Sequence, residues 1–224
     1  MQEYKFSVLM SVYYKEEPSF LAKALESVFE QTLKPSEVIL VEDGELTDEL
    51  ENVIQKFKTK YDELKIIKNK ENKGLGHALN DGLNNCTYDI VFRMDTDDIC
   101  KKNRFQVQME YLNRHPEIDV LGSNIYEFKN DIDEQMRIKK MPNGCNINKY
   151  ILKRNPINHM TVCFRKKSVI ECGGYVPLLY LEDYYLWIRM FNNNKKIENI
   201  DEELVYARIG NGFEKRRGFA TSPF

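Results

Sequence analysis

Two spacings of hydrophobic residues alternate along the first half of the chain. Short, nearly continuous apolar runs, typical of strands covered on both faces, occupy residues 6–13, 38–41, 64–67 and 88–94. Between these runs, apolar residues recur at helical spacing, and the helical stretches begin at Pro18, after Thr47 and near His77. This alternation predicts an α/β fold with a mostly parallel central sheet, right-handed crossovers and flanking helices.

The second half is patterned less regularly. We expect a helix around residues 105–112, a strand at 120–128, a polar surface excursion at 129–148, a short strand at 161–164, a helix at 182–191 and a last strand at 204–207. No linker composition separates the halves. The sequence therefore predicts one domain over residues 1–224.

Composition narrows the possible partners. Hydrophobic residues make up 42% and charged residues 30% of the 224 positions, and the net charge is -2, so nucleic acid is not an expected partner. No apolar run approaches the roughly 20 residues of a membrane span, and the first residues do not resemble a signal peptide. The basic run at 213–218 is expected to be solvated rather than to bind a membrane.

The five cysteines are odd in number and include no C-x-x-C pair. They are expected to be reduced, partly buried thiols of a cytoplasmic protein rather than a disulfide framework or a zinc site. They are Cys86, Cys100, Cys145, Cys163 and Cys172.

Acidic residues follow the apolar run at 88–94. Side chains alternate along an extended chain, so Asp95 and Asp97 are expected to point the same way at the carboxyl end of a buried strand. Open α/β sheets bind ligands at that end, and paired carboxylates suit Mg²⁺ or Mn²⁺. A solvated acidic turn that caps the next helix is an equally good interpretation of this spacing.

The absence of known phosphate-binding loops bears on whether Asp95 and Asp97 form a metal site or a solvated turn. The chain has no Walker loop, and its nearest approach to a dinucleotide fingerprint, Gly74-Leu75-Gly76, has Leu79 where the third glycine belongs. The turn after the first predicted strand, residues 11–18, contains no glycine. A protein without such amide cradles can hold a pyrophosphate through a metal, which favours a functional role for Asp95 and Asp97.

Five runs then match one enzyme family in the family's order. Together they resemble the family 2 glycosyltransferases, inverting enzymes of the GT-A fold, over about residues 6–210. The runs are Ser7-Val8-Leu9-Met10-Ser11-Val12-Tyr13, Val41-Glu42-Asp43-Gly44, Asn72-Lys73-Gly74-Leu75-Gly76, Asp95-Thr96-Asp97-Asp98 and Glu182-Asp183-Tyr184-Tyr185-Leu186-Trp187. Two further runs, at 155–159 and 173–175, are similar to those of bacterial enzymes that build surface polysaccharide.

The resemblance implies a donor site. Ser11, Val12 and Tyr13 would contact the nucleotide base, partly through the backbone, and Asp43 would hydrogen-bond it. Glu42 stands where the family usually has aspartate, so its role is open. Lys73 is either an exposed lysine or a contact to donor phosphate or base.

The family's DXD motif falls on Asp95-Thr96-Asp97. Asp97 would be the main ligand of Mn²⁺ or Mg²⁺, and Asp95 would lie near the ribose or the metal. Asp98 would support these ligands or cap the next helix.

On the acceptor side, Asp183 matches the family's catalytic base, and Glu182 would orient it. Acids in the first turn of a helix also suit its dipole, which is compatible with catalysis. Trp187 is expected to be a core anchor rather than a platform for a sugar. His159 is either a satisfied core histidine or a contact to donor phosphate or acceptor.

The implied activity is metal-dependent, inverting transfer of one sugar from a nucleoside-diphosphate donor, UDP by expectation, to a saccharide or lipid-linked saccharide in surface-polysaccharide assembly. Residues 1–100 would bind the donor and 101–224 the acceptor, with at most peripheral contact to the inner membrane face. The alternatives are a non-catalytic sugar-nucleotide-binding subunit and a nucleotidyltransferase. A nucleotidyltransferase would be expected to carry a glycine-rich loop after the first strand, and this chain has no glycine there.

Overall fold

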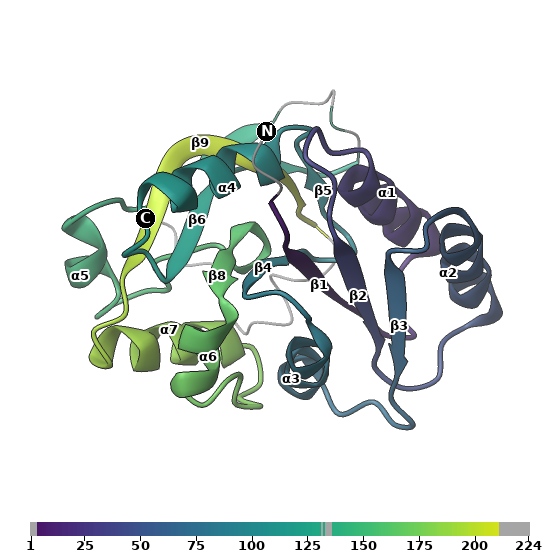
Figure 1. Cartoon of the computed structure of the whole chain (residues 1–224). Helices are drawn as coiled ribbons and strands as arrows, with labels where there is room; N and C mark the ends of the chain where they lie inside the picture. The colour runs from purple at the N-terminus through teal and green to yellow at the C-terminus, as the bar shows by residue number, and fades with distance from the viewer. Residues whose placement is uncertain (1–3, 131, 133–135, 211–224) are drawn as a thin grey trace.

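One twisted sheet runs through the protein (Figure 1). The computed structural model describes residues 4–130, 132 and 136–210. Within these residues the sheet has nine strands in the order β3-β2-β1-β4-β8-β6-β9-β5, and β7 pairs with β6. The strands of the first half are β1 (Ser7–Val12), β2 (Glu37–Glu42), β3 (Leu64–Lys68) and β4 (Ile90–Arg93).

These four strands are parallel, as their apolar runs predict. The strongly apolar β1 and β2 lie inside the group and are covered on both faces. Val8 and Met10 face a core shared with α1 (Pro18–Phe29) and α2 (Asp48–Lys60), whereas Leu9 faces the core under α3 (Leu75–Asn85). Figure 1 shows α1 and α2 on the side of the sheet away from α3. This parallel unit brings the carboxyl ends of β1, β2 and β4 to one edge.

The second half continues the sheet with mixed directions. β4 pairs antiparallel with β8 (Cys163–Arg165), and β8 pairs antiparallel with β6 (Val120–Phe128). β6 pairs parallel with β9 (Ile197–Arg208), which pairs antiparallel with β5 (Ile99–Cys100). The remaining elements are α4 (Arg104–Arg114), β7 (Arg137–Lys139), α5 (Asn146–Tyr150), η1 (His159–Thr161), α6 (Lys166–Glu171) and α7 (Glu182–Asn192).

Most of the predicted elements are present. Thr47 caps α2, with its hydroxyl accepting the Leu50 amide. The last strand is longer than predicted. The prediction began only at residue 204 because the acids at 201–203 interrupt the apolar pattern of the strand. The excursion at 129–148 contains β7 and the start of α5, short elements without a periodic signal.

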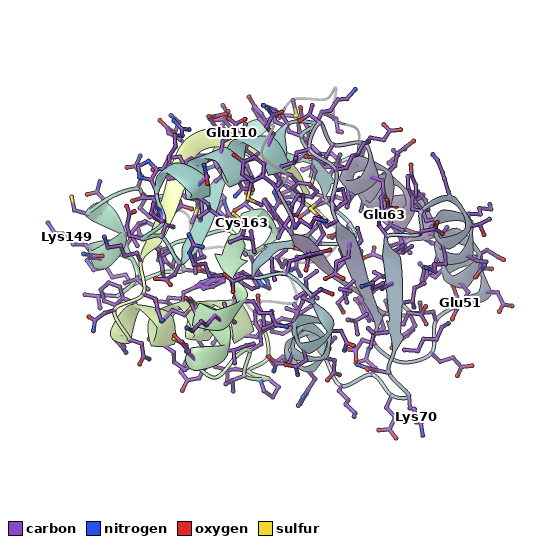
Figure 2. The ribbon with its side chains drawn as sticks, in the orientation of Figure 1. Glu51, Glu63, Lys70, Glu110, Lys149 and Cys163 are labelled. Carbon is purple, nitrogen blue, oxygen red and sulfur yellow. The ribbon has the colours of Figure 1, made fainter. Side chains whose placement is uncertain are left out.

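Charged side chains lie both on the surface and inside the protein, where Arg93 and Arg104 are buried. Figure 2 shows Glu51, Lys70 and Lys149 at the edge of the view and Cys163 near its centre, and Glu63 and Glu110 are also exposed. Cys86, Cys100, Cys163 and Cys172 are buried and Cys145 is exposed, and all five are free thiols, as predicted. Within the described ranges, no helix combines the length and apolarity that crossing a bilayer requires. The basic run at 213–218 lies outside the described residues.

Candidate active site

Three carboxylates gather where the chain leaves β4. The strand ends at Arg93, and residues 95–98 form a bend, here called the acid bend. One carboxylate oxygen each of Asp95, Asp97 and Asp98 lies within 4.8 Å of the others. The expected proximity of Asp95 and Asp97 is therefore present, although a bend produces it instead of strand alternation.

The sequence left two roles open for Asp98, and capping the next helix is not the one observed. Its Oδ1 accepts the backbone amide of Arg208 at 2.7 Å, and the N-cap residue of α4 is Asn103. The sequence missed this role because Arg208 is 110 residues away.

The acid bend is electrostatically suited to a cation. Burial, then the charges of Asp95 and Glu16, raises the pKa of Asp97 to about 7. Burial, then the charge of Asp97, raises the pKa of Asp98 well above its usual range. Mg²⁺ and Mn²⁺ prefer oxygen ligands, and these crowded, partly desolvated carboxylates offer them. The residues present therefore fit a divalent cation.

Glu16 joins this site without having been predicted. Its carboxylate accepts the Thr96 hydroxyl at 2.6 Å, and that hydroxyl lies 3.4 Å from the carbonyl oxygen of Ser11. Burial raises the pKa of Glu16, and the charge of Asp95 adds to the effect. The only sequence signal was an acid in the glycine-free turn after β1. Glu16 and Thr96 thus join the end of β1 to the acid bend.

The end of β1 also meets Asp43. Ser11 and Tyr13 are half-buried, while Val12 is buried and its carbonyl accepts the Asp43 amide at 2.8 Å. The buried Val12 side chain is therefore not available to a ligand, and its carbonyl already has a protein partner. The Asp43 carboxylate accepts the amides of Lys73 and Gly74, both at 2.9 Å. Asp43 thus fixes the loop that carries the exposed Lys73.

Glycine is required next to Asp43. Gly44 has a φ of +89°, and a Cβ there would lie 2.7 Å from the backbone nitrogen of Asn72. Glu42 accepts the Lys68 ammonium at 2.8 Å across the β2–β3 pair. This contact gives Glu42 a structural partner at the side of the site.

Asp183 lies in the first turn of α7. It is 6% exposed, its Oδ2 accepts the Asn155 side-chain amide at 2.7 Å, and its Oδ1 accepts the Tyr184 amide at 2.7 Å. The Tyr184 hydroxyl donates to the Ile151 carbonyl at 2.6 Å. The segment at 151–155 therefore orients the carboxylate. The family-like run beginning at Asn155 was the only sequence signal for this contact.

Arg93 and Tyr175 connect the acid bend with α7. The fully buried Arg93 guanidinium pairs with Asp95, and its charge also acts on buried Glu182. Burial raises the pKa of Tyr175. The charge of Arg93 lowers this pKa, and the charges of Asp183 and Asp95 raise it. Asp183 and the acid bend therefore belong to one electrostatic neighbourhood, although 88 positions of sequence separate Asp95 from Asp183.

Trp187 and His159, the two remaining candidates for ligand contacts, lie in different surroundings. Trp187 is fully buried in the core under α7, so its ring has no exposed face to stack on a sugar; it is the core anchor that was the favoured expectation. His159 is half-buried, with Nε2 3.1 Å from the Tyr175 hydroxyl. His159 thus lies beside the residues that join the two parts of the site.

Comparison with known sequences places the chain in a family. Residues 7–174 match the model described as glycosyl transferase family 2. An uncharacterized glycosyltransferase of Haemophilus influenzae is 47% identical over 95% of this chain and 79% of its own length. The amylovoran biosynthesis glycosyltransferase AmsE of Erwinia amylovora is 42% identical over 96% and 80%. A UDP-Gal:alpha-D-GlcNAc-diphosphoundecaprenol beta-1,3-galactosyltransferase of Escherichia coli is 40% identical over 96% and 78%.

Solved structures agree with the fold. S. aureus TarS (1-349) in complex with UDP-GlcNAc superposes with a TM-score of 0.76 at 23% identity, over 98% of this chain and 62% of that one. The mannosyltransferase PcManGT from Pyrobaculum calidifontis, in complex with GDP-Man and Mn²⁺, gives 0.73 at 16% identity, over 96% and 61%. These likenesses confirm the GT-A fold. With most of its length matched by the family model and by relatives at 40–47% identity, the chain belongs to glycosyl transferase family 2 and is a glycosyltransferase.

Proposed function

We propose that the protein transfers a single hexose from a UDP-sugar to a hydroxyl acceptor, with inversion and with a divalent cation, in bacterial surface-polysaccharide assembly. The observation that carries this proposal is the placement of Asp183 in one electrostatic neighbourhood with the acid bend. That arrangement would provide a site for the leaving diphosphate and a base for the incoming alcohol.

The donor would bind along the carboxyl ends of β1, β2 and β4, within residues 1–100. Ser11, Tyr13 and the backbone of Val12 line the end of β1, and Asp43 holds the loop of Lys73 beside them. Exposed Lys73 can reach toward a phosphate or the base from this loop. Two of the structural neighbours are complexes of S. aureus TarS (1-349), one with UDP-GlcNAc and one with UDP, which supports a uridine donor.

Asp97 is the main candidate ligand of Mn²⁺ or Mg²⁺, with Asp95 beside it and Asp98 within the same 4.8 Å cluster. A bound cation would supply charge stabilisation for the departing nucleoside diphosphate. Glu16 and Thr96 join the acid bend to the end of β1, which would hold the proposed cation site and nucleotide site in fixed relative positions.

Asp183 would accept the proton of the acceptor hydroxyl as the new bond forms. Because inversion is one displacement, a single base on the acceptor side is sufficient. Asn155 holds one oxygen of this carboxylate, and buried Glu182 precedes it on α7. His159, whose Nε2 lies 3.1 Å from the Tyr175 hydroxyl, would be a further candidate contact to the acceptor or the donor phosphate.

The acceptor is proposed from the relatives, within residues 101–224. One relative's name specifies a GlcNAc-diphosphoundecaprenol acceptor, and another's specifies amylovoran biosynthesis. A lipid-linked saccharide of this kind would be met at the inner face of the membrane by a cytoplasmic enzyme that makes only peripheral contact.

The test is nucleoside-diphosphate release from a panel of sugar nucleotides, with and without Mn²⁺, for the wild-type chain and Asp183→Asn. We expect Mn²⁺-dependent release with a UDP-sugar, loss of turnover by about 10²-fold or more in the variant, and unchanged UDP affinity. Normal turnover by Asp183→Asn would overturn the assignment of the base. UDP binding without transfer or hydrolysis of any donor would favour a non-catalytic binding subunit.

A further inference from the structure

Arg208, the last residue of β9, is buried beside the acid bend although its sequence context gave no hint of a role. Its backbone amide donates to Asp98 Oδ1 at 2.7 Å, and its Nε donates to the Asp97 carbonyl oxygen at 3.2 Å. Its Nη1 donates to the carbonyl oxygens of Lys129 and Asn130, at 3.3 and 3.2 Å. One side chain therefore joins the acid bend to the chain that leaves β6.

Two aromatic rings fix the plane of this guanidinium. Its central carbon lies 3.8 Å from the ring centroid of Phe20 on α1 and 4.5 Å from that of Phe128 at the end of β6. Stacking on ring faces and donating in a rigid fork are properties of arginine that lysine does not share. The direction in which Nε meets Asp97 is thus set by three elements far apart in the sequence.

The chemistry of the contact is selective. Arg208 binds the main-chain carbonyl of Asp97, so the bond fixes the backbone and leaves the carboxylate oxygens to a ligand. In their charged forms the carboxylates of Asp95, Asp97 and Asp98 would repel one another, and this repulsion would favour opening of the bend. The Arg208 guanidinium opposes this opening because it binds the backbone of Asp97, and it does so without pairing directly with the acidic side chains.

We propose that Arg208 is a positioning residue for the cation and diphosphate site, acting through the backbone of Asp97 rather than by touching the donor. The inference rests on the proposed function, because it requires that Asp97 binds the metal. Partners of metal ligands typically change metal affinity by about 10–100-fold when they are replaced. Arg208 is expected to act within that range.

The experiment uses the full chain with UDP and follows Mn²⁺ binding by electron paramagnetic resonance. Arg208→Lys should weaken Mn²⁺ binding by about tenfold or more, and kcat should recover when Mn²⁺ is raised in proportion. UDP affinity without metal should not change. Arg208→Gln, with its melting temperature recorded, serves as the second variant if Arg208→Lys folds poorly.

Arg165→Lys is the matched control. Arg165 is half-buried and donates to the Ile118 and Pro116 carbonyls at 3.0 and 3.1 Å, and it pairs with Ile90 at the amino end of β4, away from the acid bend. Its Mn²⁺ affinity should equal that of the wild type. A binding defect of the same size in Arg165→Lys would reduce the effect to general destabilisation and overturn the inference.

Asp97→Asn separates the two proposals. If the wild type binds Mn²⁺, Asp97→Asn does not, and a folded Arg208 variant binds like the wild type, only the role of Arg208 falls. If Asp97→Asn binds Mn²⁺ like the wild type, the metal assignment itself falls, and the role of Arg208 falls with it.

Discussion

Several side chains of the candidate site hold other groups of the protein in place. Asp43 accepts two amides from the loop at 72–74, one on each carboxylate oxygen. Glu16 and Asn155 hold the acid bend and Asp183 in place through side-chain contacts. At the scale of residues, the site is therefore a set of polar anchors that give its loops one conformation.

Asp43→Asn should destabilise the protein. The amide has one acceptor oxygen, so either Lys73 or Gly74 would face an NH₂ group, and hydrogen bonds to charged groups contribute about 1.5–3 kcal/mol each. We expect a loss of about that size in the free energy of unfolding, measured by urea denaturation, together with weaker UDP binding. Exposed Asp62→Asn should change stability by less than about 0.5 kcal/mol. Equal stabilities of the two variants would refute the anchoring role.

Asn155→Ala should impair turnover more than binding. It removes the donor to Asp183 Oδ2, and misorientation of a general base can cost much of its roughly 10²–10⁴-fold contribution. Steady-state kinetics should show kcat lowered by about tenfold or more with little change in the KM for the donor. Exposed Asn193→Ala at the end of α7 should leave both constants unchanged. A change in donor KM alone would contradict the positioning of Asp183 by Asn155.

At the scale of elements, strands and helices were predictable where their patterns were regular. β1, β2 and β3 follow from continuous apolar runs, and α1, α2 and α7 from helical spacing. The site contacts were not predictable, because Asn155–Asp183, Thr96–Glu16 and Arg208–Asp97 join residues 28, 80 and 111 positions apart. Asp95 and Asp97 were identified because they are close in sequence.

The packing of α3 on the sheet depends on a small residue. A Cβ on Gly82 would lie 2.3 Å from Leu9 Cδ1 and 2.8 Å from Val41 Cγ2. Gly82→Ala should therefore cost about 1–3 kcal/mol of stability by overpacking, despite the better helix propensity of alanine. Urea denaturation should show this loss, whereas exposed Asn84→Ala should be nearly neutral. A stabilised Gly82→Ala would show that α3 packs less closely than described.

At the scale of the whole molecule, the sheet brings acids from opposite halves of the chain into one electrostatic neighbourhood. The acid bend follows β4, and Asp183 lies in the first turn of α7, which comes after β8 in the chain. The antiparallel β4–β8 pair fixes the distance between the two halves of the sheet. Assigning residues 1–100 to the donor and 101–224 to the acceptor remains a proposal, although a single sheet spans both.

The crowding of acids makes stability depend on pH. Without metal, the folded state holds a proton on Asp97 up to about pH 7, while the unfolded chain releases it near pH 4. The folded state then binds more protons between these values, so this group's contribution to stability falls as the pH rises through the window. In EDTA, Asp97→Asn should raise the melting temperature relative to the wild type more at pH 8 than at pH 5, by about 2–4 °C for each kcal/mol gained. The same difference at both values would show that Asp97 is not strained by burial and charge.

The most direct test of the whole account is a crystal structure of Asp183→Asn with its UDP-sugar donor and Mn²⁺. We expect Mn²⁺ bound to the Asp97 carboxylate and to the diphosphate, the nucleotide base beside Ser11 and Tyr13, and the substituted side chain at position 183 facing the sugar from the acceptor side. Mn²⁺ bound away from Asp97, or a side chain at position 183 turned away from the sugar, would contradict the account.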